Sequence, residues 1–377
     1  MNRFLKTIFI FTLPYLIVTL FFLFVYFSSR ESYFSFDTKT EKQIGYIGSE
    51  KLSTYKINAI LQRPKYSIWV LGTSRVLQFR KEMFTKQFYN LGLSVTAVRS
   101  YIDFLKKIPA NKLPDYLLVS LDQRNFNNKY ETYESSLVPP YSFEKLSLYE
   151  DFKSFIKNLI LNPNLIWEYL KNIGQIGSDD IGLYAKVYMN GFRNDGSHLN
   201  GYGLYKTIKT NNNQNFTGWF VENLKTQSTH GFEEGEFVDP RFINEVENLI
   251  KFCATRHIKP IIFLPPFPPS VFDKLNNNKY SYIKKASKQL SALCINKGVP
   301  FFDFTHIDSV YDHNFLDGTH GSEIVNLKLL TLMDQSSEVH RMGIISGINP
   351  DTNSNLFLFK SDSLKIFKRF EGTRIKN

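Results

Sequence analysis

Cysteine is scarce in this chain of 377 residues, which contains only Cys253 and Cys294. So few thiols exclude a disulfide-stapled scaffold and a zinc module built from several cysteines. One disulfide in an oxidising compartment and two buried free thiols both remain open, and we favour the free thiols. Aromatic residues, by contrast, are plentiful, with 35 Phe and 21 Tyr. The chain can therefore bury one large hydrophobic core or two modest ones.

Charged residues are absent from residues 7–29, TIFIFTLPYLIVTLFFLFVYFSS. A helix of that length crosses a bilayer core of about 30 Å. Arg3 and Lys6 precede the run, so the positive-inside rule leaves the N-terminus in the cytoplasm and the remaining chain outside. A cleavable signal peptide has a shorter apolar core ending in small residues, whereas this run continues into YFSSRES without an alanine. We predict an uncleaved transmembrane anchor over residues 1–29 and a polar stalk over 30–64.

The formal net charge is +11, and most of it lies outside the predicted anchor. A basic domain held at the outer side of a membrane could meet anionic lipid headgroups or acidic envelope polymers. A solvated basic surface without such a partner is the alternative. Nucleic acid is not an expected partner in that compartment.

Short apolar runs that end in turn residues alternate with stretches of helical spacing. This alternation is typical of a parallel sheet covered by helices on both faces. The predicted strands are residues 68–71, 88–92, 115–122, 259–264 and 299–304. The helices predicted between and after these strands include residues 95–107, 281–297 and 322–333. A further helix is predicted to begin at Pro240, with Asp239 as its N-cap.

The alternation of strands and helices is interrupted between about residues 125 and 238, where two helical stretches are followed by Gly-, Asn- and Asp-rich segments. We predict one domain over residues 65–343 that contains this long insertion. Residues 344–377 are basic and rich in Asn and Ser, and the sequence predicts no element in this C-terminal tail.

Polar residues follow several of the predicted strands. Ser74, Gly92 and Asp122 come just after strand ends, and the loop FLDGTHGSE over residues 315–323 carries Asp317 and His320. Ligands of open parallel sheets bind at the carboxyl ends of the strands, so we expect these residues to meet at one edge.

Together these residues have the composition of a serine-hydrolase site. His320 can take the proton of Ser74, and Asp317 can hold the imidazole in the required tautomer. The backbone N–H groups of Ser74 and Gly92 are the candidate oxyanion-hole donors, with Ser74 expected at the start of a helix. His306 and His313 are weaker candidates for the base. Asp303, Asp312 and His313 could suggest a metal site, but structural hydrogen bonding is the better interpretation, and we predict no metal and no organic cofactor.

The motifs GTSR, NLGLS, SLDQ and DGTH resemble the SGNH (GDSL-like) hydrolase superfamily. More narrowly, they are similar to its membrane-anchored extracytoplasmic branch, which includes alginate acetylation and lipoteichoic acid D-alanylation proteins. The resemblance covers residues 66 to about 335, apart from the insertion. It implies a three-layer α/β/α, flavodoxin-like domain in which Ser74 is the nucleophile, Gly92 an oxyanion-hole residue, and Asp317 with His320 the remaining triad members.

The chain departs from the family pattern at two points. Thr73 stands where the family has Asp, with Arg75 after the serine, and Asp122 stands near the position where an Asn supplies an oxyanion donor. An ionised Asp accepts hydrogen bonds and would repel an oxyanion. The residues that could replace this donor or bind an acidic substrate are Arg75, Asp122, Gln123, Arg124, Asn125 and Arg193.

The resemblance implies a serine esterase or O-acyltransferase that acts on acyl esters, with acetyl the expected group, of an envelope or secreted polysaccharide. It also implies a multi-spanning membrane acyltransferase as partner, because one anchor helix cannot carry an acyl group across a bilayer. The alternative is a non-catalytic glycan-binding or assembly protein that keeps the fold. A lipase acting on small molecules at the membrane is a third interpretation.

Overall fold

The computed structural model describes residues 2–29, 45, 52–95, 97–129, 148–171, 180–210, 213–226, 232–348 and 356–372. The chain forms two compact units. The smaller unit comprises residues 1–51, 144–194 and 375–377, and the larger unit comprises residues 52–143 and 195–374.

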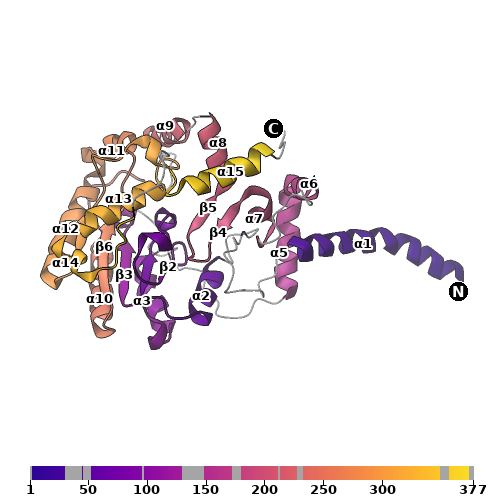
Figure 1. The fold of residues 1–377 in the computed structure, drawn as a ribbon, viewed down its shortest axis with the longest axis horizontal. Coiled ribbons are helices and arrows are strands. Elements are labelled where there is room, and N and C mark those ends of the chain that lie inside the picture. The colour runs from indigo at the N-terminus through magenta and orange to yellow at the C-terminus, as the bar shows by residue number, and fades with distance from the viewer. Residues whose placement is uncertain are drawn as a thin grey trace. The chain divides into compact units, whose positions relative to one another are not determined.

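A five-stranded parallel sheet is the centre of the larger unit (Figure 1). Its strands lie in the order β2-β1-β3-β6-β7, and every described pairing in it is parallel. The strands span Ile68–Leu71 (β1), Phe88–Asn90 (β2), Tyr116–Ser120 (β3), Lys259–Leu264 (β6) and Phe301–Asp303 (β7). The predicted α/β class with a parallel sheet is therefore confirmed.

Side chains of each strand alternate between two hydrophobic cores, one on each face of the sheet. In β1, Trp69 and Leu71 belong to the first core, whereas Ile68 and Val70 belong to the second. The other strands follow the same alternation, because successive side chains of a strand point to opposite faces. Both faces are buried, which explains why the strands read as continuous apolar runs.

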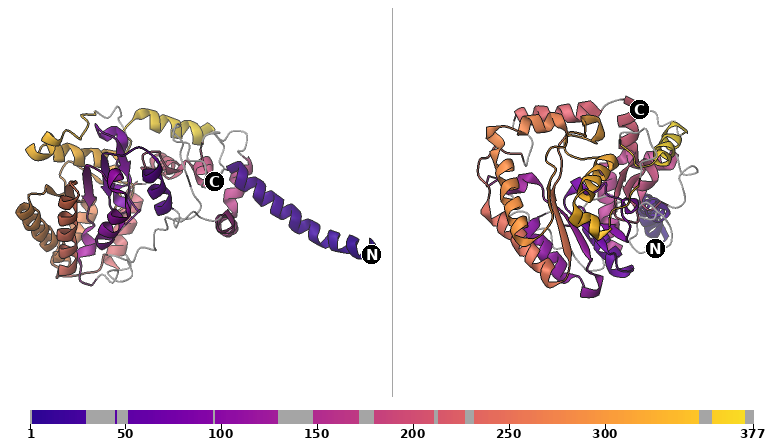
Figure 2. Two further views of the ribbon diagram at one scale, coloured as in Figure 1. Left: turned by 90° about the horizontal axis from the view of Figure 1, so that it is seen from below. Right: turned by 60° about the vertical axis from the view of Figure 1, so that its left-hand side comes forward.

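Different helices supply the two cores, and Figure 2 shows helices on both sides of the strands. The first core takes side chains from α2 (Leu52–Gln62), α3 (Val98–Lys107), α9 (Asn213–Lys225), α10 (Pro240–Thr255), α11 (Pro269–Leu275) and α12 (Ser281–Lys297). The second core takes them from α13 (Glu323–Asp334) and α14 (Ser337–Met342). Cys253 and Cys294 are free thiols buried in the first core, and burial raises the pKa of each to about 12.

Local signals set several helix ends. The Asp239 side chain accepts a hydrogen bond from the Arg241 N–H at 2.9 Å, and Pro240 is the first residue of α10, as predicted. Gly298 ends α12 in the left-handed conformation at φ 64°, which glycine adopts without strain.

The segment after β1 differs from the prediction. We expected a helix beginning at Ser74, but the structure has a single 3-10 turn, η2 (Ser74–Val76), and then a second, η3 (Lys81–Met83). So short a turn has no extended row of aligned peptide dipoles, so Ser74 does not lie at the N-terminus of a long helix.

In the smaller unit, α1 (Asn2–Ser29) contains the predicted anchor. Residues Phe4–Ser29 have a mean hydropathy of 2.6, and this helix is long and apolar enough to cross a membrane. Near its end, Tyr26 packs edge-on against Phe152 and Phe155 of α5 (Leu148–Leu161). The unit also contains α6 (Pro163–Lys171), α7 (Leu183–Tyr188) and β4 (Asn190–Phe192). Of the predicted stalk, residues 30–51 lie outside the described residues apart from Gly45. The prediction of a stalk was wrong for residues 52–62, which form α2 of the larger unit and bury Ile57 and Ile60 in its first core.

The predicted insertion is divided between the units. Residues 144–194 belong to the smaller unit with α1, whereas 195–238, which contain β5 (His198–Asn200), α8 (Gly201–Thr210) and α9, belong to the larger unit.

The C-terminal tail contains an element that the sequence did not predict, helix α15 (Lys360–Gly372). Ile366 and Phe370 of this helix are buried, and Tyr205 of α8 packs against the Phe370 ring at 5.3 Å. Before the helix, Leu358 is fully buried in the second core, and its N–H donates to Glu323 at 2.8 Å. The tail is thus part of the packed domain.

Leu358→Ala is expected to lower the free energy of unfolding by about 2–5 kcal/mol, because it leaves a cavity in the second core. Urea denaturation of the full chain measures this loss. Leu364→Ala is the matched control: that side chain is 58% exposed, so the change should stay within about 0.5 kcal/mol. Equal losses in the two variants would show that the tail does not pack as described.

Candidate active site

The candidate site lies at the carboxyl edge of the sheet. Ser74 follows β1, and η5 (Gln123–Phe126) follows β3, the neighbouring strand. Numbered along the chain within the sheet, the strand order is 2-1-3-4-5. Connections leave β1 and β3 in opposite directions there, and ligands of such sheets bind in the crevice at this switch point.

The loop between η7 (Asp312–Asn314) and α13 brings Asp317 and His320 to Ser74. His320 Nε2 lies 2.6 Å from Ser74 Oγ, and His320 Nδ1 lies 2.7 Å from Asp317 Oδ2. The loop is held by its own carboxylate, since Asp317 Oδ1 accepts from the backbone N–H groups of Thr319 and His320. The three predicted triad residues are therefore within hydrogen-bond distance in series.

The charge state of Asp317 fixes the direction of these bonds. Burial raises its pKa, but the hydrogen bond from His320, the charge of His320 and two backbone N–H donors outweigh burial and hold the pKa at about 2. An ionised carboxylate only accepts, so His320 Nδ1 carries the hydrogen. In the neutral form of the imidazole, Nε2 is then the acceptor that faces the Ser74 hydroxyl. This is the tautomer that a general base for serine requires.

Arg75, next to Ser74, is buried and uses all five guanidinium N–H groups. Its Nη1 donates to Gln123 Oε1 at 2.8 Å and to Asp122 Oδ1 at 3.3 Å. Its Nη2 donates to the carbonyl oxygens of Pro265 and Pro266, at 3.2 and 2.5 Å. Its Nε donates to the Thr319 carbonyl at 3.1 Å. Arg75 therefore joins the loops after β1, β3 and β6 to the His320 loop, and no N–H is left for an acidic substrate.

Asp122 and its neighbours take structural positions. Asp122 is 3% exposed and is paired with Arg75, with Arg124 at 3.7 Å from its other oxygen. The Gln123 amide donates to the Pro265 carbonyl and to Thr305 Oγ1 at 2.7 and 3.1 Å, so it is not free to hold an oxyanion. Asn125 is buried, and its backbone N–H donates a hydrogen bond to the Asp122 carbonyl at 3.1 Å.

The oxyanion-hole prediction for Gly92 stays a prediction. The Gly92 N–H donates to Asn90 Oδ1 at 2.8 Å, so that hydrogen bond must be exchanged before Gly92 can bind an oxyanion. The Asn90 amide donates in turn to the carbonyl oxygens of Val76 and Phe79. The Ser74 N–H has no hydrogen-bond partner among the residues that the structure describes.

Two contacts around the site were not predicted. Lys56 of α2 is fully buried, and its Nζ donates to the Gly92 carbonyl at 2.7 Å. Phe220 of α9 lies so close to Gly318 that a Cβ at that position would come within 2.4 Å of the Phe220 Cβ. No sequence spacing connects these residues, which are up to 98 positions apart, so only the folded chain reveals the contacts.

The other predicted candidates lie elsewhere. His306 Nε2 contacts Asp308, and its ring stacks on Phe272 at 4.4 Å. His313 stacks on Tyr311. Asp303 and Asp312 accept hydrogen bonds from Thr305 and Ser270, and the described residues contain no group of metal ligands. Arg193 belongs to the smaller unit, so its relation to Ser74 is not defined.

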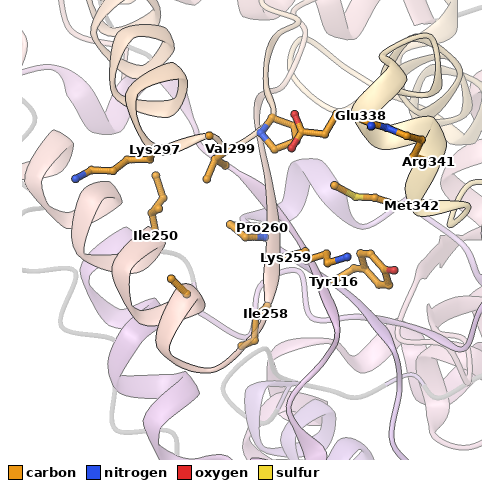
Figure 3. A pocket seen from close by; sticks show the side chains of 13 residues that line it. Tyr116, Ile250, Ile258, Lys259, Pro260, Lys297, Val299, Glu338, Arg341 and Met342 are labelled. Atoms are coloured by element: carbon orange, nitrogen blue, oxygen red, sulfur yellow. The ribbon is translucent and has the colours of Figure 1, made fainter.

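A cavity of about 420 Å³ lies at the opposite edge of the sheet (Figure 3). It is lined by the amino ends of β3 and β6, among them Tyr116 and Lys259, and by Arg341 and Met342 of the α14 segment. Its lining contains none of the triad residues, and Lys297 at its rim is paired with Glu247. This cavity is therefore not part of the candidate site.

No protein-family model matches this chain, and no curated protein sequence matches it. The geometry alone thus carries the functional argument.

Arg75→Met is expected to lower the free energy of unfolding by about 3–5 kcal/mol, because it leaves Asp122 buried without its main partner. Urea denaturation should also show that Arg75→Met with Asp122→Asn costs less than the sum of the single changes. Lys225→Met removes an exposed ion pair with Glu222 and serves as control, with a change within about 0.5 kcal/mol. If the losses in unfolding free energy of the two single changes simply add in the double variant, Arg75 and Asp122 are not energetically coupled.

Asp317 should make stability depend on pH in the acid range. Its pKa of about 2 lies below the unfolded value of about 3.9, so its contribution is complete above about pH 5 and is lost as pH falls toward 2. The difference in unfolding free energy between wild type and Asp317→Asn should therefore be constant above about pH 5 and shrink between about pH 5 and pH 2. The side chain is 40% exposed, so solvent reduces the effect. A difference that does not change with pH would refute the ionised pair.

Proposed function

We propose that this chain is a membrane-anchored, extracytoplasmic serine esterase or O-acyltransferase with an SGNH-type three-layer α/β/α domain. The observation that carries the proposal is the hydrogen-bonded series Ser74 Oγ, His320 Nε2, His320 Nδ1 and Asp317 Oδ2, with both distances at or below 2.7 Å. Its position at the carboxyl edge of a parallel sheet with order 2-1-3-4-5 supports it. The apolar helix α1 supports the anchor, with the domain on the outer side.

In the proposed reaction, Ser74 Oγ attacks the carbonyl carbon of an acyl ester while His320 Nε2 takes its proton. The tetrahedral intermediate collapses, and His320 returns the proton to the departing alcohol. An acyl-Ser74 ester remains. His320 then deprotonates a sugar hydroxyl or a water molecule, whose oxygen attacks the acyl carbon. The bond between Ser74 Oγ and the acyl carbon breaks, and His320 returns the proton to Ser74 Oγ. A sugar acceptor gives transfer, and water gives hydrolysis. Asp317 stabilises the imidazolium at both steps.

The oxyanion requires N–H donors, and the Ser74 N–H is the available one. Gly92 can join it only after its bond to Asn90 Oδ1 is exchanged. A missing donor costs about 3 kcal/mol, a hundredfold or more in rate. We therefore expect slow turnover until an acyl donor or a partner protein reorganises the Gly92 loop. The proposed acyl donor is a multi-spanning membrane acyltransferase, and the proposed acceptor is an envelope or secreted polysaccharide.

A second candidate function is that of a non-catalytic glycan-binding protein. It is favoured by the engagement of Gly92 and by the Arg75–Asp122 pair at the place of the family's amide donor. Such a protein would keep its cellular role after Ser74→Ala, whereas a catalyst would lose polymer modification.

The proposed nucleophile can be tested with a fluorophosphonate probe on the full chain in detergent micelles. We expect one adduct, located at Ser74 by peptide mapping and absent in Ser74→Ala. His320→Ala should slow labelling at least about a hundredfold, because the general base is lost. His306→Ala is the matched control and should label at the wild-type rate.

Two results would contradict the proposal. One is the absence of an adduct on wild-type protein whose fold is verified by circular dichroism. The other is an adduct that forms as fast in His320→Ala as in wild type, because the serine would then not be activated by His320.

A further inference from the structure

A groove between α11 and α12 lies at the same sheet edge as Ser74. It has a volume of about 590 Å³ and is hereafter the α11–α12 groove. Its wall includes Asp303 and Thr305, which follow β7, and the first turns of α12. The full lining is Phe272, Leu275, Asn276, Asn277, Asn278, Tyr280, Ser281, Ile283, Lys284, Lys285, Lys288, Asp303, Thr305 and His306.

The groove is connected to the candidate site by hydrogen bonds. Thr305 Oγ1 accepts from the Gln123 amide at 3.1 Å, and Gln123 Oε1 accepts from Arg75 at 2.8 Å. β1 and β7, which precede Ser74 and Thr305, are three strand spacings apart, roughly 14 Å. A ligand that reaches both places must therefore be extended, as a polymer is.

The charge of the groove is positive and largely unneutralised. Lys284 and Lys288 are exposed, lie one helical turn apart, and have no hydrogen-bond or ion-pair partner among the described residues. Lys285 donates to the Glu236 carbonyl, which does not cancel its charge. The one carboxylate in the lining, Asp303, already accepts from Ser287 Oγ and the Thr305 N–H.

This arrangement is unfavourable for the empty protein. Like charges at i and i+4 repel each other on a helix, and positive charges near a helix N-terminus oppose its dipole. A bound anion would relieve both effects.

The remaining lining suits a sugar. The side-chain amides of Asn276 and Asn278 have no hydrogen-bond partner among the described residues, so they can bind hydroxyl groups. The His306 ring, stacked on Phe272, adds a flat surface. A hollow with these groups fits a chain of sugars better than a flat membrane surface.

We propose that the α11–α12 groove binds an acidic segment of the polysaccharide at a distance from the ester that reacts at Ser74. The inference rests on the proposed function, and it assigns that substrate a negative charge. Binding energy from this remote contact would hold the polymer across the carboxyl edge while its acyl group is exchanged.

Polygalacturonate is the probe for the test, with neutral dextran as its control. Binding is measured by titration calorimetry on the full chain in detergent micelles, with Ser74→Ala as background so that turnover is excluded. Lys284→Gln with Lys288→Gln should weaken polygalacturonate binding about tenfold, the effect of two exposed charge contacts.

The matched control is Lys106→Gln with Lys107→Gln, which removes two exposed lysines at the end of α3 and gives the same net charge. It should bind as tightly as the background protein. Equal weakening by both pairs would overturn the proposal, because binding would then follow the net charge. Failure of the protein with native lysines to bind polygalacturonate would overturn it too.

The fluorophosphonate reaction separates this inference from the proposed function. The groove variant with Ser74 retained should label at the wild-type rate, since Lys284 and Lys288 do not touch the triad. Labelling without groove-dependent binding overturns the inference alone. Groove-dependent binding without labelling overturns the catalytic proposal and leaves an acidic-glycan-binding protein.

Discussion

The candidate site depends on the hydrogen bonds and the ion pair that the buried Arg75 guanidinium makes. This guanidinium is planar and buried, and its donors point in fixed directions toward three other segments of chain. A lysine could not replace it, because three donors on a flexible stem cannot reach five acceptors in one plane. Burial lowers the pKa of this guanidinium, and the charge of Asp122 opposes that effect. The site therefore requires an acidic partner at the end of β3.

This requirement explains why two unusual residues occur together. In the sequence, Arg75 after the proposed nucleophile Ser74 and Asp122 after β3 look like separate departures from the pattern of the SGNH superfamily that the chain resembles. In the folded chain each is the other's buried partner, at 3.3 Å. An asparagine at position 122 would leave the buried Arg75 charge uncompensated. Because Arg75 holds the loops together, the amide donor of the family pattern cannot occupy position 122 in this chain.

Much of the fold could be predicted because its signals are local. The strand runs, the Asp239 cap and the helix of α12 follow from spacing within a few residues, and their bounds agree with the structure within a few positions. The pairing of Asp317 with His320 could also be predicted locally, because the two residues share one loop. Their contact with Ser74 followed only from the rule that parallel strands end at one edge.

The remaining features depend on contacts over long sequence distances, which composition does not encode. Arg75 could have been a substrate ligand until Pro265, Pro266 and Thr319 were seen to accept its hydrogen bonds. The tail appeared polar because the buried positions of α15, Ile366 and Phe370, are few.

Burial divides the candidate site into an inaccessible part and a part that remains exposed. Arg75, Asp122 and Gln123 are nearly inaccessible, whereas His320 and Asp317 keep 32% and 40% of their side-chain surface exposed. The groups proposed to exchange protons lie near solvent, whereas the groups that hold their loops are buried. The buried Gln123 and Arg75 side chains link Thr305 in the α11–α12 groove to the residue next to Ser74. A substrate proposed to bind three strands away would therefore be joined to the site through ordered, inaccessible side chains.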